Sequence, residues 1–275
     1  MRIFITVVLC LAMAQAAFAQ KKSPRTTTNF NTGWKFFLGD VPDAMATDFS
    51  DQAWRTLDLP HDWSVEGEFS EKNPAGVGGG ALPGGIGWYR KTFSLPEDDK
   101  SKKHFIRFDG VYKNSEVFVN GQSVGVRPNG YISFEYDISQ YLKFGSEKNV
   151  IAVKIDNSKQ PNSRWYSGSG IYRNVWLTTV HKIYIPYGGT FVQTPAVNAQ
   201  AAVVSSDIQV KNETDGDQQI QIVTEIVSSS GKVVASAVAA QTFRKREALI
   251  ISQTMQVDNP VLWSVDNPVL YKAVT

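Results

Sequence analysis

A polar and aromatic segment at residues 156–173, which reads DNSKQPNSRWYSGSGIYR, carries side chains suited to holding a sugar. Trp165 and Tyr166 could stack on a pyranose ring. Three polar side chains could donate hydrogen bonds to ring hydroxyls: Asn157, Asn162 and Arg164. Small-ligand sites combine apolar surface with a few placed polar groups in this way. A structural interpretation, in which Trp165 and Arg173 only pin a loop, remains equally open.

Four carboxylates lie close together at Asp62, Glu66, Glu68 and Glu71. Glycoside hydrolysis needs two carboxyl groups on either side of one bond, about 5 Å apart in retaining enzymes. Nothing in the sequence indicates burial that would raise the pKa of one member, and no strand end fixes their separation. We therefore interpret this cluster as structural and assign no catalytic residue.

Other reaction classes find no support in the residues. The histidines His61, His104 and His181 lack metal-ligand spacing, and we expect a structural role for His104. No Gly-x-Ser-x-Gly nucleophile elbow is present, since the run at 167–170 resembles one only in composition. The single cysteine, Cys10, lies in the leader described below. We predict no metal and no cofactor.

Charge and hydropathy limit the partners. The chain has 275 residues with 28 basic and 26 acidic side chains, so it lacks the basic surface of a nucleic-acid-binding protein. Residues 1–19 form a secretory signal: Arg2, an apolar stretch, and Ala17-Phe18-Ala19 before the cleavage point. No later segment is long and apolar enough to span a membrane. We expect a secreted or periplasmic protein, with residues 20–29 as a linker.

The remaining chain alternates with period two and predicts an all-β protein. Strands are expected at residues 88–95, 104–109, 117–125 and 150–155, and at 175–180. Asn120-Gly121 predicts a type I′ hairpin turn, because both residues accept positive φ. The glycine- and proline-rich residues 73–87 predict a long loop without regular structure.

The composition shifts near Val180 toward Val, Ala, Ser and Gln, which places a domain boundary there. Residues 181–275 predict an immunoglobulin-like sandwich, with strands at 202–212, 218–228, 232–240 and 248–257. Alternation at residues 270–275 runs to the last residue, so we expect this sandwich to be incomplete. Residues 30–180 predict a jelly-roll sandwich.

Several motifs occur in an order that resembles the amino-terminal half of glycoside hydrolase family 2. They are DQAWR at 51–55, LPHDW at 59–63, GWYRK at 87–91, FDGV at 108–111, VNG at 119–121, GY at 130–131, RWYSGSGIYR at 164–173 and LWS at 262–264. The resemblance covers residues 29–275 and is closest to secreted bacterial β-galactosidases.

This resemblance implies a jelly-roll sugar-binding domain and an immunoglobulin-like domain, followed in the family by a (β/α)₈ barrel that carries the catalytic glutamates. That barrel, of about 250 residues, is absent from this chain. The implied function is the non-catalytic part of a retaining exo-glycosidase that hydrolyses terminal β-D-galactosides in oligo- or polysaccharides. A β-glucuronidase or β-mannosidase parent and a free-standing carbohydrate-binding module are the alternatives.

The resemblance also implies which residues bind sugar. The loops would reach toward the barrel, with Asn73, Asp156 and Asn157 contacting the terminal sugar and Arg164 and Trp165 shaping the loop. The implied partners are a carbohydrate and the barrel of the same protein, and the parent could form a homo-oligomer.

Overall fold

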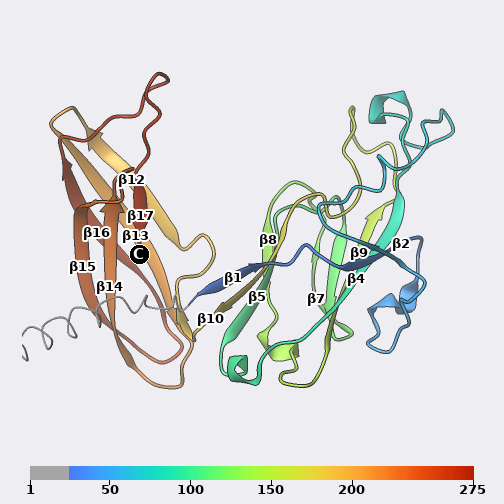
Figure 1. Cartoon of the computed structure of the whole chain (residues 1–275), viewed down its shortest axis with the longest axis horizontal. Coiled ribbons are helices and arrows are strands. Elements are labelled where there is room, and N and C mark those ends of the chain that lie inside the picture. Colours follow the sequence, from blue (N-terminus) through green and yellow to red (C-terminus); the bar gives the residue numbers. More distant parts are fainter. Residues whose placement is uncertain (1–24) are drawn as a thin grey trace, which may run out of the picture.

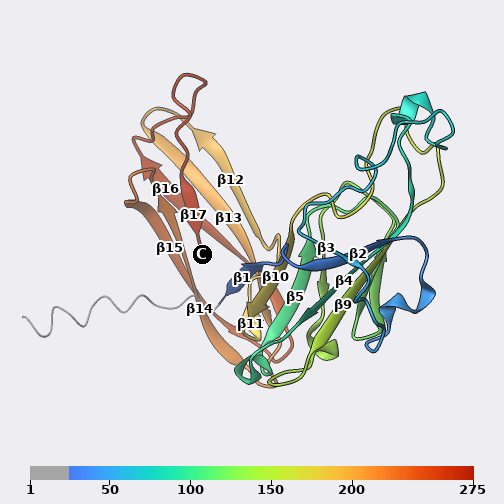
Figure 2. The same ribbon diagram turned by 45° about the vertical axis from the view of Figure 1, so that its right-hand side comes forward.

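The computed structural model describes residues 25–275, which form two β-sandwiches (Figures 1 and 2). The signal sequence expected at residues 1–19 lies outside the described residues. The strands of the first sandwich are β1 (Thr26–Asn29), β2 (Trp34–Leu38), β3 (Arg55–Leu57), β4 (Gly85–Phe93), β5 (Lys103–Phe108), β6 (Ser115–Val119), β7 (Gln122–Arg127), β8 (Phe134–Asp137), β9 (Asn149–Asn157) and β10 (Val175–Val180). The chain is all-β, as its alternation predicts.

Two antiparallel sheets make up the first sandwich, in the strand orders β3-β2-β4-β9-β6-β7 and β1-β10-β5-β8. The side chains that alternate inward from both sheets form one apolar core. Its members include Trp34, Phe36, Tyr89, Ile106, Phe108, Ile151 and Leu177. Burying each large side chain contributes about 1.5–3 kcal/mol, so this core stabilises the jelly roll that carries the loops discussed below.

The outer face of the larger sheet is also covered, because residues 41–54 fold back over it. Trp54 and Trp88 are buried there with Ala152 of β9. Arg90 of β4 is 1% exposed and binds the covering residues 41–54. Its Nε lies 3.0 Å from Asp51 Oδ2, and its guanidinium donates to the backbone oxygens of Ala44, Ala46 and Phe49. The outer face of β9 is therefore partly buried: Val150 and Ala152 are buried there, and Lys154 and Asp156 are half-buried.

The second sandwich contains β11 (Ile183–Tyr184), β12 (Thr190–Val197), β13 (Ala201–Asn212), β14 (Gln218–Val227), β15 (Val233–Phe243), β16 (Ala248–Asp258) and β17 (Lys272–Val274). One sheet joins β11, β12 and β16 to β13, and the other has the order β15-β14-β17. Apolar residues of both sheets bury one another in two clusters, one around Val204 and Ile226 and one around Ile208 and Phe243.

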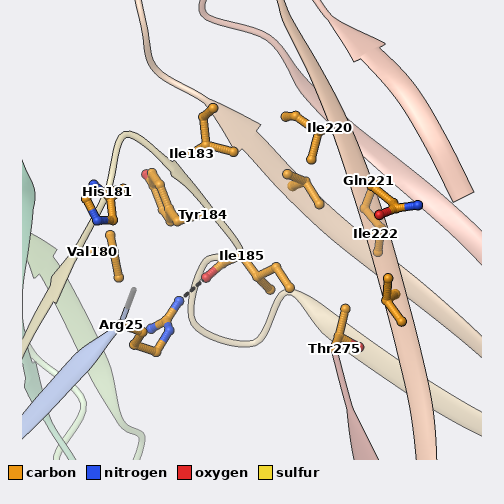
Figure 3. A pocket seen from close by; sticks show the side chains of 12 residues that line it. Arg25, Val180, His181, Ile183, Tyr184, Ile185, Ile220, Gln221, Ile222 and Thr275 are labelled. Carbon is orange, nitrogen blue, oxygen red and sulfur yellow. Dashed lines mark hydrogen bonds between the residues drawn. The ribbon is translucent and has the colours of Figure 1, made fainter. Parts of the chain in front are cut away.

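β17 pairs with β14 only at Glu225–Val227. Beside the remaining length of β14, a cavity of about 400 Å³ opens toward the first sandwich (Figure 3). Its lining includes Ile183, Tyr184, Ile220, Ile222 and Thr275. Among the described residues, no strand pairs with this edge of β14 along residues 218–224.

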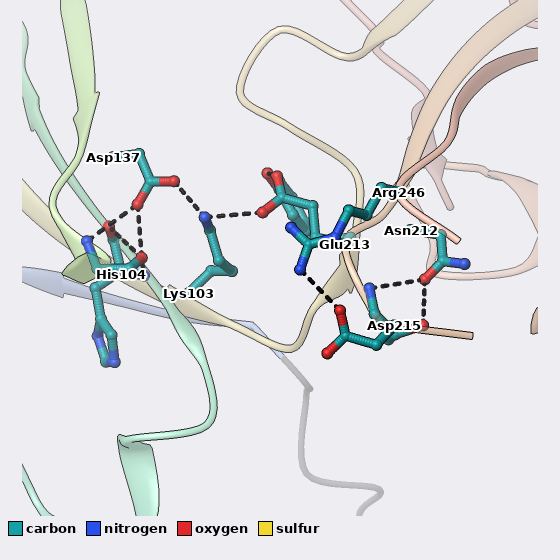
Figure 4. Close-up of polar contacts among 10 residues, drawn as sticks. Lys103, His104, Asp137, Asn212, Glu213, Asp215 and Arg246 are labelled. Carbon is teal, nitrogen blue, oxygen red and sulfur yellow. Dashed lines mark hydrogen bonds and ion pairs between the residues drawn. The ribbon is translucent and has the colours of Figure 1, made fainter. Parts of the chain in front are cut away.

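Polar contacts join the two sandwiches (Figure 4). Lys103 of β5 lies between Asp137 of the first sandwich and Glu213 of the second, 2.8 Å from Glu213 Oε2. The Tyr184 hydroxyl donates to Glu213 Oε1 (2.5 Å), and Tyr184 also packs against Phe105, with ring centroids 5.5 Å apart. A cation shared by two carboxylates thus links the two units.

The structure corrects two expectations about local structure. Residues 26–29, assigned to a linker, form β1 and pair with β10, because their extended backbone adds an edge strand. The loop expected at residues 73–87 contains a short 3-10 helix, Val77–Gly79, and its last residues begin β4 at Gly85. The turn at Asn120-Gly121 is confirmed, with φ of 50° and 83° and Val119 paired with Gln122.

Candidate functional site

Two loops far apart in the sequence meet at one end of the first sandwich. One connects β3 to β4 and the other connects β9 to β10, and both project together from the sheets (Figures 1 and 2). They are tied at their base by backbone hydrogen bonds from His61 N to Ile171 O (2.8 Å) and from Trp63 N to Ser169 O (3.0 Å). We call them together the loop pair.

Asp62 is the polar centre of the loop pair. Its Oδ1 accepts hydrogen bonds from the backbone amides of Ser64 (2.9 Å) and Ser169 (2.8 Å), and its Oδ2 accepts one from the Tyr166 hydroxyl. Burial and then this hydrogen bond raise the pKa of Tyr166, so the phenol stays protonated and remains a donor. In the sequence, Asp62 was interpreted only as a member of a carboxylate cluster; its place in the LPHDW motif was the available signal.

Asn157 organises the same loop from the inside. It is 2% exposed, and its Nδ2 donates to Gly168 O (3.0 Å) and Ser169 Oγ (2.8 Å). Its Oδ1 accepts from Gln160 (3.0 Å) and Asn162 (2.6 Å). Since an amide offers two donors and two lone pairs, all of its hydrogen-bonding capacity is used within the chain. This departs from the expectation that Asn157 contacts a sugar.

Asp156 precedes it at the end of β9, where it pairs with Ile86 of β4. Its Oδ1 accepts from the backbone amide (2.9 Å) and hydroxyl (2.5 Å) of Ser158. Partial burial alone would raise the pKa of Asp156, but these hydrogen bonds outweigh it and leave the pKa below its ordinary value. The carboxylate is therefore charged at neutral pH, and its Oδ2 accepts no hydrogen bond from the described residues.

Asn73 lies in the β3–β4 loop, and both hydrogens of its amide donate within that loop, to Glu68 O (3.0 Å) and Ala81 O (2.8 Å). No residue in the described part of the chain donates to its side-chain oxygen. The cavity enclosed between the two loops measures only about 10 Å³, room for about one water molecule. The interior of the loop pair is therefore too small for a sugar, and only its outer surface could meet one.

That outer surface carries the aromatic and basic residues of the expected site. Trp165 is 66% exposed, and Tyr166 and Arg164 are exposed beside it. The high exposure of Trp165 argues against the interpretation in which its indole only pins the loop, because a pinning side chain would be buried.

The four carboxylates at residues 62–71 do not form a catalytic pair. Asp62 is committed to the loop pair, and Glu66 Oε2 lies 2.8 Å from the Arg55 guanidinium. Burial raises the pKa of Glu66, but hydrogen bonds from Arg55 and His61 outweigh this and leave it below its usual value. Glu68 and Glu71 are exposed. A general acid needs the opposite shift.

The histidines are accounted for by the fold. His104 is fully buried, with Nε2 3.0 Å from Asp99 O and Nδ1 3.1 Å from the Thr179 hydroxyl, in keeping with a structural role. Within residues 25–275, no three His, Cys, Asp or Glu side chains gather closely enough to hold a metal ion. No helix in that same range has the length and hydropathy needed to cross a bilayer.

The protein is thus a pair of β-sandwiches, a jelly roll with protruding polar and aromatic loops joined to an immunoglobulin-like sandwich. The profile "Glycosyl hydrolases family 2, sugar binding domain" matches residues 28–181, and the profile "Glycosyl hydrolases family 2" matches residues 183–275. The chain belongs to glycosyl hydrolase family 2.

Its relatives carry two kinds of name. A region of 253 residues is 49% identical to the beta-galactosidase BoGH2A of Bacteroides ovatus, covering 92% of this chain and 30% of that protein. A putative beta-glucuronidase of Formosa agariphila is 42% identical over 271 residues, which cover 98% of this chain and 25% of that protein. The chain thus spans about a third or less of the length of these relatives.

Solved structures agree on the architecture. A glycosyl hydrolase family 2 member from Bacteroides cellulosilyticus superposes with a TM-score of 0.86 at 35% identity, covering 90% of this chain and 32% of that one. A beta-glucuronidase of the same family also reaches a TM-score of 0.86, at 32% identity, over 92% of this chain and 29% of that one.

Proposed function

We propose that this chain is the non-catalytic amino-terminal part of an exported retaining exo-glycosidase that removes terminal β-D-galactosyl residues. In this proposal the loop pair contributes part of the pocket for the terminal sugar, and a carboxyl-terminal barrel supplies the catalytic carboxylates. The family membership and the names of the relatives support a glycosidase parent.

The charge of Asp156 is the observation that favours a neutral sugar over a glucuronide in this proposal. The Asp156 carboxylate is charged at neutral pH, and one of its oxygens accepts no hydrogen bond within residues 25–275. A negative charge at the sugar pocket would repel the carboxylate of a glucuronide and would accept a hydrogen bond from a galactoside hydroxyl. The competing β-glucuronidase assignment, supported by the name of the Formosa relative, predicts the opposite preference.

The test uses the full-length parent enzyme and two neighbouring substitutions. Asp156→Ala should lower kcat/KM on an aryl β-galactoside by about 5- to 150-fold, the equivalent of one hydrogen bond worth about 1–3 kcal/mol, and leave the Tm nearly unchanged. Asn157→Ala should lower the Tm, because four hydrogen bonds of a buried amide are lost.

The matched control is Asp48→Ala, since Asp48 is an exposed aspartate outside the loop pair. Wild-type kcat/KM for Asp156→Ala would refute the role of Asp156. Faster hydrolysis of an aryl β-glucuronide than of the β-galactoside would replace the substrate assignment.

A free-standing sugar-binding role is the second candidate, favoured by the exposure of Trp165. It predicts that the isolated chain binds galactosides with useful affinity and that Trp165→Ala abolishes this binding. The glycosidase proposal instead predicts weak binding by the chain alone, because the barrel would complete the pocket.

A further inference from the structure

We propose a second sugar-binding site on the first sandwich, in a cleft lined by β2, β3 and part of the β3–β4 loop, which includes none of the exposed residues 164–166. The cleft has a volume of about 420 Å³, within the range of about 300–1,000 Å³ typical of small-molecule sites. Its principal walls are Phe37, Leu38, Trp54, Arg55, Trp63 and Glu66. This second site goes beyond the proposed function and does not depend on it.

One wall of the cleft is a flat apolar platform. Phe37 is 41% exposed and stacks on Trp54, with ring centroids 5.5 Å apart and planes inclined by 26°. Trp54 is only 7% exposed and itself packs against Phe49. An exposed ring backed by a buried one has a fixed orientation, so a pyranose face could stack on it without an ordering cost on the protein side.

Opposite this platform, the polar side chains of Arg55 and Glu66 are held in place by hydrogen bonds. Glu66 accepts two hydrogen bonds from one guanidinium nitrogen of Arg55, at 2.9 and 2.8 Å. That nitrogen also lies 2.7 Å from His61 Nε2, and His61 Nδ1 lies 2.6 Å from the Tyr89 hydroxyl. His61 Nε2 also lies 3.3 Å from Glu66 Oε1, so the imidazole contacts both members of the ion pair.

These contacts leave hydrogen-bonding capacity for a ligand. The other guanidinium nitrogens of Arg55 have donors to spare, and each Glu66 oxygen retains a lone pair. The Arg55 and Glu66 side chains are 50% and 42% exposed, so a ligand can reach both. The cleft therefore offers fixed donors and acceptors opposite an aromatic face.

The charge of the cleft identifies the class of ligand. Arg55 and Glu66 cancel one another, and burial lowers the pKa of His61, which keeps that ring neutral. A site with no net charge offers no net electrostatic attraction to an anion or a cation. A purely apolar ligand would leave Arg55 and Glu66 without hydrogen bonds to it. A neutral saccharide matches it, because one ring face is apolar and its edge carries hydroxyls.

The experiment titrates the isotope-labelled chain with lactose, cellobiose and xylobiose and follows amide and indole resonances by NMR. At least one disaccharide should shift the signals of Leu38, Arg55, Gly67 and the Trp54 indole. Phe37→Leu, which keeps apolar volume and removes the flat ring, should weaken this binding at least tenfold. Phe191→Leu is the matched control, since Phe191 is an exposed phenylalanine of β12 in the second sandwich.

Trp165→Ala separates this site from the proposed function, because it alters the loop pair and should leave the cleft signals responsive. The inference is overturned if none of the three disaccharides shifts the cleft signals. It is also overturned if Phe37→Leu binds as tightly as wild type, or if Trp165→Ala abolishes the shifts in the cleft. None of these outcomes bears on the role of Asp156 in the full-length enzyme.

Discussion

The hydroxyl of Tyr166 donates a hydrogen bond to the carboxylate of Asp62, although the two residues are 104 positions apart in the chain. The same carboxylate accepts from the backbone amide of Ser169. One side chain at the start of the β3–β4 loop thus determines where the β9–β10 loop lies. The loop that presents Trp165 is held by tertiary contacts rather than by its own sequence.

Replacing Asp62 should therefore loosen the loop pair. Asp62→Ala removes the acceptor for two backbone amides and for Tyr166, and we expect the free energy of unfolding to fall by about 1–3 kcal/mol. Denaturant titration measures this change, and Asp48→Ala should leave it unaltered. A loss no greater than in the control would show that water replaces these contacts freely.

Gly168 tests the close approach of Asp62 to the backbone. Its φ is +75°, and a Cβ there would lie 2.5 Å from Asp62 Oδ2. Gly188 has a φ of +71° and no heavy atom within 4 Å of such a Cβ. Both Gly→Ala variants should bear the cost of a left-handed backbone, about 1–2 kcal/mol. Gly168→Ala should lose more in thermal unfolding, and equal losses would contradict a tight contact.

Arg90 should be the most sensitive charged residue of the first sandwich. Arg90→Met leaves the Asp51 carboxylate and several backbone oxygens of the cover without their donor, and we expect a loss of about 3–5 kcal/mol. Arg90→Lys should recover only part of this, since an ammonium cannot reproduce the guanidinium fork. Urea unfolding monitored by Trp fluorescence would check both; full stability of the lysine variant would show that charge alone suffices.

The link between the sandwiches should depend on pH. Partial burial raises the pKa of Glu213, but hydrogen bonds from Lys103 and Tyr184 outweigh it and leave the pKa below its usual value. Because this folded-state pKa is depressed, the contribution of Glu213 is complete above the ordinary pKa of a glutamate and disappears as the pH falls through the folded value.

Glu213→Gln should accordingly lower the free energy of unfolding by about 1 kcal/mol or less at pH 7, after solvent screening, and by progressively less under acidic conditions. The control is Asp215→Asn. Because the ion pair of Asp215 with Arg246 is exposed to solvent, its loss should not change the free energy of unfolding. A pH-independent effect of Glu213→Gln would show that packing, not charge, accounts for the contribution.

Much of the fold follows from the sequence because strands are local patterns. The alternation at residues 175–180 predicted β10, and Asn120-Gly121 predicted the β6–β7 hairpin, since side-chain direction and positive φ depend on a few adjacent residues. Strands without that pattern were not predicted. β1 is an exposed run of three threonines and Asn29, and it is a strand because it pairs with β10. The family was evident from motifs, which are also read along the chain.

The site divides in the same way. Its candidate sugar-binding groups could be read from residues 156–173, because aromatic and amide side chains are recognisable by type. Their accessibility could not: Trp165 and Asn157 are eight positions apart, yet the first is 66% exposed and the second 2% exposed. The sequence by itself determined which polar and aromatic side chains the loop contains. Only the tertiary structure decided that the Asn157 amide forms its hydrogen bonds inside the loop. Hydrogen bonds between distant segments compete with a ligand for the same donors and acceptors, and that competition is settled by packing.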